Sequence, residues 1–287
     1  MQLKSTATGA AEFVPGPWLI DLGCSAIPGC WVMPAGVALA ADRELPGVPC
    51  VTWPELARIV KKKSGAYQCF RGGAVAATKI RGVSSLTGKP GVLVPLERAE
   101  GGPPTVKLGG YYMHRMQKLT PAEDAADKLG ALGRRGLRGR VLDTCTGLGY
   151  TALGAAARGA SEVVTIELDP LMVDMQRANP WSAPLFAHPK IARFLGCAAG
   201  LLPSAPDAHF DTVVHDPPSI ETAGMLYGAA FYAQLRRVLR SGGVLYHYVG
   251  EPKARDSVFR GVMERLQRAG FEVTKVPASY GVRAVAR

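Results

Sequence analysis

The sequence predicts an α/β protein with a mostly parallel β-sheet, and three observations support this class. Strand-like and helix-like segments alternate from residue 116 to the C-terminus. Each helix-like segment is long enough to cross over a sheet, as parallel strands require. Residues 272–279 and 281–287 close the chain as a strand pair, which predicts one antiparallel strand at the sheet edge. We therefore expect an α/β domain at 116–287 after a small α+β region at 1–115.

The N-terminal region is rich in glycine and proline and has few periodic segments. Thr52-Trp-Pro-Glu55 matches a capping box that opens a short helix. Residues 73–80 fit a strand, and residues 91–96 and 105–108 flank the loop AEGGPP, which predicts a hairpin. We expect residues 1–115 to serve as a substrate-binding or lid region.

The second region begins with a helix in LTPAEDAADKL, where Thr120 fits the N-cap and Pro121 the first helical position. Strands then alternate with helices along most of the region. The expected strands are RVLD, SEVVTIE, residues 191–195, FDTVV and VLYHYVG, and the expected helices are TALGAAARGA, LMVDMQRANPW, AAFYAQLRRVLRSGG and SVFRGVMERLQRAGF. Such an order predicts a sheet that is covered by helices on both faces.

The composition describes a globular chain with a core, because 47% of the residues are hydrophobic and 20% are charged. No run approaches the ~18 apolar residues that a membrane span needs. The first residues lack the charged-then-apolar order of a signal peptide. We therefore expect a cytoplasmic protein with no membrane partner.

The net charge of +11 admits a nucleic-acid partner or an acidic ligand. However, the basic residues are mostly arginine in a chain rich in Ala, Gly and Pro, a bias that GC-rich coding also produces. Nucleic-acid binding therefore stays open but is not favoured. The six cysteines form no CxxC pair and no paired Cys/His spacing, so we expect free thiols and no metal site.

The stretch VLDTCTGLGYTA, residues 141–152, is the clearest functional signal. Its strand ends at Asp143, and Gly147 and Gly149 in the following turn let backbone approach a ligand. The next strand ends at Glu167, where a carboxylate can accept two hydrogen bonds from a ribose diol. Because ligands of such sheets bind beyond the carboxyl ends of the strands, we expect a nucleoside there.

Phosphate binding is less well supported at this turn. The pattern GxGxxG is not met, because Thr151-Ala152 follow Tyr150 where a third glycine is due, and Gly-Lys-Ser/Thr is absent. The sequence therefore favours a nucleoside without phosphates, with a cationic group that Asp143 would attract.

Residues 119–287 resemble class I S-adenosylmethionine-dependent methyltransferases, which have a Rossmann-like fold. The family's first motif, acid-x-G-x-G-x-G, corresponds to Asp143-Thr144-Cys145-Thr146-Gly147-Leu148-Gly149. The resemblance implies S-adenosylmethionine as cofactor, with Asp143 and Thr144 in its binding loop. Asp143 would hold the cofactor's ammonium group directly or through water, Glu167 would hold the ribose hydroxyls, and Leu168 would pack on the adenine.

Two positions depart from the family pattern. Cys145 replaces the first glycine, and we interpret it as a small packing residue beside the cofactor, with a redox or nucleophilic role as the alternative. Gly196-Cys197-Ala198 stands where the family often has Gly-Asp-Ala, so a hydrogen bond to the adenine amino group must come from backbone or be missing. By resemblance, Cys197 and Ala198 still contact the cofactor. More narrowly, the runs MHRMQKLTPAEDA, VLDTCTGLGYTA, ANPWS, HDPPS and GVLYHYVGEP resemble a mainly archaeal group of predicted methyltransferases, which implies no firm substrate.

The segment HDPPS places Asp216 at the carboxyl end of the strand FDTVV, near the expected sulfonium. Amino-group methylases of nucleic acids resemble it with Asp/Asn-Pro-Pro-aromatic, where the polar residue accepts hydrogen bonds from the target NH₂ and the aromatic stacks on a base. Ser219 takes the aromatic position here, which favours a small acceptor over a nucleobase. We predict Asp216, Ser219 and His114 as catalytic residues, His114 as a general base or else as a structural histidine.

Other side chains are weaker candidates at this end of the sheet. His215 and His247 lie near strand ends and fit structural histidines better than bases. Aromatic rings can hold a sulfonium by cation–π attraction. The candidates for this role are Tyr111, Tyr112, Tyr150, Trp181, Tyr246 and Tyr248.

Three hypotheses follow for function. The first is methyl transfer to a nitrogen or oxygen acceptor, with a small molecule favoured over RNA. The second is attack at the aminopropyl or aminocarboxypropyl carbon, or cyclisation to azetidine-2-carboxylate, with release of methylthioadenosine. The third is a nucleic-acid-binding module that kept the fold as a scaffold, against which Asp143 and Glu167 argue. The sequence leaves open the acceptor, the carbon attacked and the oligomeric state, a homodimer included.

Overall fold

The computed structural model describes residues 80–94, 102–117, 119–133, 137–251 and 255–287, together with short strands between residues 12 and 79. The chain divides into two compact units. The first comprises Met1–Pro121 and Asp174–Ala183, and the second comprises Ala122–Val173 and Pro184–Arg287. The boundary that the sequence places between residues 115 and 116 stays a prediction, as does the lid role of the first region.

The first unit holds an antiparallel sheet in the order β10-β9-β8-β7. The predicted hairpin is confirmed, because β8 pairs antiparallel with β9 from Gly91↔Leu108 to Val94↔Thr105. Leu93 and Val106 lie side by side in the register and are fully buried, so they form the centre of this sheet's core. The four strands are β7 (Arg81–Val83), β8 (Pro90–Val94), β9 (Thr105–Leu108) and β10 (Tyr111–Tyr112).

Short strands precede this sheet. A second antiparallel sheet has the order β1-β2-β3-β4, and β5 pairs with β6. The helix predicted after Thr52 lies outside the described residues, and of the strand predicted at 73–80 the structure describes β6. The strands are β1 (Glu12–Val14), β2 (Cys30–Met33), β3 (Gly36–Leu39), β4 (Val51–Thr52), β5 (Tyr67–Gln68) and β6 (Thr78–Lys79).

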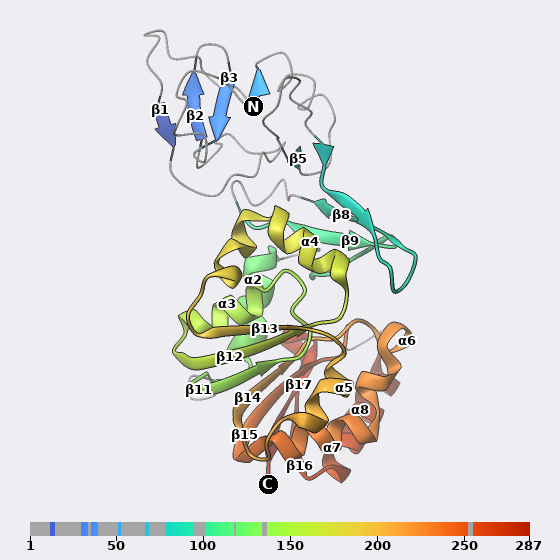
Figure 1. The fold of residues 1–287 in the computed structure, drawn as a ribbon. Helices are drawn as coiled ribbons and strands as arrows, with labels where there is room; N and C mark the ends of the chain where they lie inside the picture. Colours follow the sequence, from blue (N-terminus) through green and yellow to red (C-terminus); the bar gives the residue numbers. More distant parts are fainter. Residues whose placement is uncertain are drawn as a thin grey trace. The chain divides into compact units, whose positions relative to one another are not determined.

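The second unit contains a seven-stranded sheet in the order β13-β12-β11-β14-β15-β17-β16 (Figure 1). Neighbours from β13 to β15 are parallel, which confirms the predicted α/β class with a mostly parallel sheet. The strands are β11 (Gly139–Asp143), β12 (Ala160–Glu167), β13 (Ile191–Leu195), β14 (Phe210–His215), β15 (Leu239–Tyr248), β16 (Phe271–Val276) and β17 (Gly281–Ala286).

The C-terminal strands correct one detail of the prediction. The antiparallel strand is β17, but it lies between β15 and β16 and is not at the edge. β17 turns back directly from β16 and fills the position beside β15, which leaves β16 outermost. The sheet therefore has β13 and β16 as its two edges.

Helices connect the strands of the second unit. They are α2 (Pro121–Gly130), α3 (Tyr150–Ala157), α4 (Pro170–Ala178), α5 (Ala198–Leu201), α6 (Ile220–Ala223), α7 (Ala229–Val238) and α8 (Asp256–Arg268), with 3₁₀ turns η2 (Pro180–Phe186), η3 (Leu202–Ser204), η4 (Gly224–Tyr227) and η5 (Pro277–Ser279). The helix predicted to continue through Gly243 ends earlier, at Val238. The backbone becomes extended at Leu239, and Gly243 lies so close to the carbonyl oxygens of Arg240 and Asp211 that a side chain there would collide.

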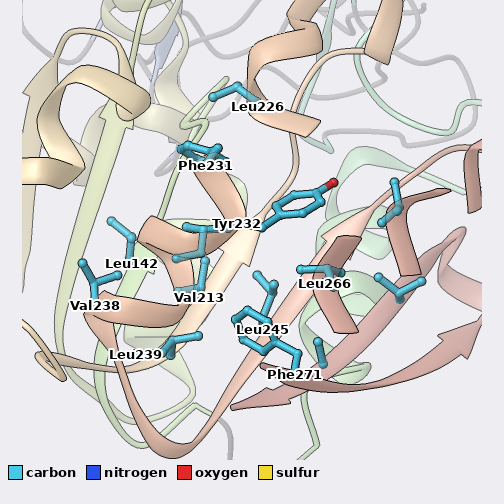
Figure 2. Close-up of a cluster of buried hydrophobic side chains, with 14 of the residues drawn as sticks. Leu142, Val213, Leu226, Phe231, Tyr232, Val238, Leu239, Leu245, Leu266 and Phe271 are labelled. Carbon is cyan, nitrogen blue, oxygen red and sulfur yellow. The ribbon is translucent and has the colours of Figure 1, made fainter. Parts of the chain in front are cut away.

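Two apolar layers cover the sheet, and adjacent strand residues face opposite layers. In β11, Val141 packs with α2 and α3, whereas Leu142 packs with α7 and α8. β14 and β15 repeat this alternation. Figure 2 shows the second layer, in which Leu142, Val213 and Leu245 of the sheet lie with side chains of the helices. Complete burial of each such side chain stabilises the fold by about 1.5–3 kcal/mol, so both layers fix the strand ends that carry the site.

Candidate functional site

The candidate site lies at the carboxyl ends of β11, β12 and β14. The chain runs from β11 to β12 on one side, and β14 pairs with β11 on the other, so the strand order reverses here. Parallel α/β sheets bind ligands at such a reversal. Asp143 ends β11, Glu167 ends β12, and Asp216 follows β14, so three carboxylates reach this edge.

Asp143 is fully buried beneath the loop that follows β11. Its Oδ2 accepts a hydrogen bond from the hydroxyl of Thr165 at 2.7 Å, and its Oδ1 accepts one from the hydroxyl of Thr151 at 3.3 Å. Burial raises the pKa of Asp143 to about 7, against the hydrogen bond from Thr165, and the charge of Asp216 raises it further.

Glu167 is half-buried and holds the same loop from the neighbouring strand. Its Oε2 accepts the backbone N–H of Gly147, and its Oε1 accepts that of Asp169, both at 2.8 Å. Burial raises the pKa of Glu167 to about 7 even though these backbone donors favour its charged form. Each carboxylate oxygen has two lone pairs, so both oxygens can accept a further hydrogen bond from a diol.

The backbone conformation of the loop favours glycine at two positions. Gly147 has φ +54° and Gly149 has φ +81°, a region that glycine occupies without steric cost. Gly149 is the N-cap of α3, and a Cβ built on it would lie 2.1 Å from Leu185 Cδ1. Gly149 is therefore required by its conformation and by packing against Leu185, and not only by the approach of a ligand.

Thr144 and Cys145, which follow Asp143, make contacts within the sheet and the hydrophobic core. Thr144 is buried, and its hydroxyl lies 2.7 Å from His215 Nδ1, so it is used within the sheet. Cys145 is a half-buried free thiol that packs against the core. Burial, with the charges of Glu167 and Asp143, raises its pKa well above the ordinary value. Such a thiol is a poor nucleophile, which supports its interpretation as a packing residue.

The predicted adenine side of the site is formed by the ends of β12 and β13. Leu168 is 48% exposed directly after β12, so an apolar surface is available there. Cys197 is the N-cap of α5 and is half-buried, with its Sγ 3.9 Å from Met225 Sδ. Ala198 is buried in the first turn of α5 and packs in the core. The structure thus brings Leu168 and Cys197 to the same sheet edge as Glu167.

Asp216 has a partner that the sequence analysis missed. Lys128 of α2 is buried, and its Nζ lies 2.5 Å from Asp216 Oδ2 and 2.9 Å from Asp124 Oδ2. The same ammonium lies 4.7 Å from the ring centroid of Tyr248. Burial alone lowers the pKa of Lys128, but the charges of Asp216 and Asp124 outweigh burial and hold the pKa above its ordinary value. Spacing gives one signal for this residue, because Lys128 falls on the same helix face as buried Ala125, Leu129 and Leu132.

The other two predicted catalytic residues are placed differently. Ser219 is exposed at the start of α6, and its Oγ lies 3.4 Å from Thr222 Oγ1. His114 belongs to the first unit, where its Nδ1 lies 2.8 Å from the hydroxyl of Thr105. Because His114 and Asp216 belong to different units, their joint action stays a prediction.

The buried histidines and one aromatic candidate belong to the core. His215 Nε2 lies 3.0 Å from the carbonyl oxygen of Leu226, and burial lowers the pKa of His215 to about 3. Burial also holds the pKa of His247 well below its ordinary value, and its Nε2 lies 2.9 Å from the Tyr232 hydroxyl. Tyr246 is fully buried and donates to the Ser279 carbonyl at 2.6 Å. None of the three is placed to act on a ligand.

In the part of the chain that the structure describes, no three or more potential metal-ligating side chains cluster, and no helix is long and apolar enough to cross a membrane.

The fold is shared with spermidine synthases. The Thermotoga maritima spermidine synthase matches with a TM-score of 0.56 and 14% identity, covering 77% of this chain and 78% of that one. A spermidine synthase in complex with the transition-state analogue AdoDATO matches with a TM-score of 0.57 and 16% identity over the same shares. These likenesses concern the fold alone, a Rossmann-like α/β fold of the kind that spermidine synthases contain.

Sequence comparisons give relatives of two kinds. Residues 127–247 match a family model described as "Conserved hypothetical protein 95". The chain is 44% identical over 188 residues to an uncharacterised protein of Methanocaldococcus jannaschii, a match that covers 64% of each protein. It is 32% identical over 130 residues to polyamine aminopropyltransferase 2 of Streptomyces coelicolor, covering 41% of this chain and 24% of that protein. The match thus spans less than two thirds of the length of either relative.

Proposed function

We propose that this chain is an S-adenosylmethionine-dependent transferase that moves a methyl group to a nitrogen or oxygen of a small acceptor. The observation that carries the proposal is the set of carboxylates at the reversal of strand order. Burial raises the pKa of Asp143 and that of Glu167 to about 7. A ligand that brings positive charge and no phosphate removes this instability.

S-adenosylmethionine fits these groups, since it carries a sulfonium, an ammonium and a ribose diol. Glu167 is assigned to the ribose, because its two oxygens face the loop from the tip of β12. Asp143 acts from beneath the loop as a buried negative charge, since threonine hydroxyls already hold both oxygens. Leu168 and Cys197 provide the surface for the adenine.

Asp216 is assigned to the acceptor. Its side chain is 21% exposed, whereas its partners Lys128 and Asp124 are buried. When bound, the cofactor supplies an electrophilic carbon on a sulfonium leaving group. The acceptor atom then forms the bond to that carbon with its lone pair, the carbon–sulfur electrons return to sulfur, and the acceptor's proton passes to solvent. The protein's task is alignment, which Asp216 provides by accepting a hydrogen bond from the acceptor.

One incubation tests this function. Purified protein is mixed with S-adenosylmethionine and a panel of small amines and alcohols, and the nucleoside product is identified by mass spectrometry. Methyl transfer yields S-adenosylhomocysteine and a methylated acceptor. Absence of cofactor binding in calorimetry would refute the proposal.

Two comparisons support a second candidate function. The relative from Streptomyces coelicolor is named as an aminopropyltransferase, and the spermidine synthases share the fold. We therefore propose, as the alternative, attack at the aminopropyl or aminocarboxypropyl carbon of the same sulfonium, cyclisation to azetidine-2-carboxylate included. Methylthioadenosine as the product, with S-adenosylmethionine alone or with its decarboxylated form and a diamine, would favour this alternative.

A further inference from the structure

Lys128 stands out because the fold alone does not require it. Its ammonium is 2% exposed and is shared by two carboxylates, Asp124 of its own helix and Asp216 after β14. Burying an ammonium costs several kcal/mol, and a buried ion pair seldom stabilises more than well-packed apolar side chains. A methionine or leucine at this position would attach α2 to the core at lower cost. The lysine therefore calls for a local explanation.

The local effect of Lys128 is on Asp216. Asp216 is the member of the cluster that reaches solvent, with 21% of its side chain exposed, whereas Asp124 is fully buried. Backbone restraint comes from the other side, because Pro217 and Pro218 follow and the Tyr227 hydroxyl donates to the Pro218 carbonyl at 2.9 Å. Asp216 is thus held at its backbone by the prolines and at its carboxylate by the ammonium.

We propose that Lys128 is a positioning residue, anchored by Asp124, which keeps the Asp216 carboxylate ionised and oriented to accept a hydrogen bond from an amine acceptor. The inference rests on the proposed function and narrows its acceptor to nitrogen. An ionised carboxylate only accepts hydrogen bonds, and an amine can donate one while its lone pair stays available. A hydroxyl nucleophile needs a proton acceptor, and a carboxylate that is paired with a cation is a weak one.

Several titratable groups surround Asp216 and must be separated from the effect of Lys128. Protonation of Asp143 changes the electrostatic field at Asp216. Its effect on affinity is shared by all ligands that contain the adenosyl and amino-acid parts. Comparing two such ligands therefore removes most of its contribution. The groups that face Asp216 or its partner are Asp124 and Lys128 of α2, Asp143 and Cys145 at the end of β11, Tyr227 of η4 and Tyr248 of β15.

The test compares two probes, sinefungin and S-adenosylhomocysteine. Sinefungin carries an ammonium where the methylsulfonium of the cofactor would be, and S-adenosylhomocysteine is uncharged there. The full-length wild type is expected to bind sinefungin about tenfold more tightly, as one charge-assisted hydrogen bond provides. Asp216→Asn is expected to bring the ratio of the two affinities to about one, because an amide carries no charge.

In Lys128→Met, the ratio of sinefungin affinity to S-adenosylhomocysteine affinity is expected to fall on acidification from about pH 7 to about pH 5.5, and to fall more steeply than in the wild type. The reason is that the neighbouring carboxylates of Asp124 and Asp216, without the Lys128 cation, take up a proton. Arg158→Met is the matched control. It removes a cation that contacts the same helix, through a hydrogen bond from Nη1 to the Ala126 carbonyl at 3.2 Å, and it should leave the ratio and its pH dependence unchanged. A purely structural role would weaken both probes equally and leave the ratio intact.

An unchanged ratio and pH dependence in folded Lys128→Met would overturn the inference. If that variant does not fold, Asp124→Asn takes its place. Loss of the Asp124 charge that anchors Lys128 is then expected to lower the ratio of the two probe affinities at least threefold. On the free-energy scale, threefold is roughly half of the tenfold preference. An unchanged ratio contradicts the inference. Failure of the wild type to bind either probe would instead remove the proposed function, so the two failures are distinguishable.

Discussion

Affinity for S-adenosylmethionine should fall as the pH falls below 7. The perturbation is acidification from about pH 7 to about pH 5, and it acts on the Asp143 and Glu167 carboxylates, each with a pKa of about 7 without ligand. Protons and the cationic ligand compete for these groups, since a cation favours the charged form and ordinary carboxyl values lie near 4. Affinity therefore falls on acidification, because binding requires ionised carboxylates and acid protonates them.

The magnitude follows from the same pKa values. Well below pH 7, each pH unit requires about 1.4 kcal/mol to ionise one carboxyl group, which lowers affinity about tenfold. With two such groups, affinity falls by up to about a hundredfold per pH unit, although their mutual repulsion makes them titrate as a pair. Ligand binding should also release up to two protons.

Isothermal titration calorimetry in two buffers with different ionisation enthalpies measures both the affinity and the proton release. Glu167→Gln is the internal comparison, because it leaves one titrating carboxylate and should halve the slope of log affinity against pH. An affinity that is independent of pH, or that rises on acidification, would refute the reasoning.

Three further predictions concern single residues. Gly149→Ala should lower the free energy of unfolding by about 1–3 kcal/mol, because a Cβ at φ +81° meets Leu185. Urea titration measures this loss. The control is Gly200→Ala, whose Cβ makes only ordinary contact and which should show no comparable loss. Glu167→Gln at neutral pH should weaken S-adenosylmethionine binding about tenfold or more, since a charge-assisted hydrogen bond is lost, while leaving the thermal midpoint nearly unchanged; a collapse of the midpoint would point to a structural role. The folded state excludes a proton from His215, whose pKa is about 3 there, whereas the unfolded chain takes one up below pH 6.5. The stability gap between wild type and His215→Gln should therefore shrink by about 1.4 kcal/mol per pH unit on acidification below that value, and a gap that stays constant would contradict the assignment of a buried neutral imidazole.

Much of the fold could be predicted because local pattern and tertiary structure agree. The alternation of strand and helix segments after residue 116 determines the parallel sheet, and Pro121 does begin α2. The edge assignment failed because sequence order does not show whether β17 pairs with β15 or lies outside β16. The end of α7 was misplaced because Arg240-Ser241-Gly242-Gly243 looks like a helix terminus but belongs to strand β15.

The site was only partly visible for the same physical reason. Strand-end carboxylates at Asp143 and Glu167 follow from local pattern and known loop geometry. The pairing of Lys128 with Asp216 joins residues 88 positions apart, and no local rule predicts it. A lysine four residues after Asp124 usually indicates an exposed helix pair, and only its place on the buried face of α2 signals otherwise. Burial also decides that Thr144 serves the core, which periodicity alone does not reveal.

The most direct test of the central claim is a crystal structure of the full-length protein with S-adenosylmethionine. We expect the ribose hydroxyls on Glu167, the adenine beside Leu168 and the sulfonium at the loop near Asp216. An adenosyl group bound elsewhere, with these carboxylates untouched, would contradict the central claim.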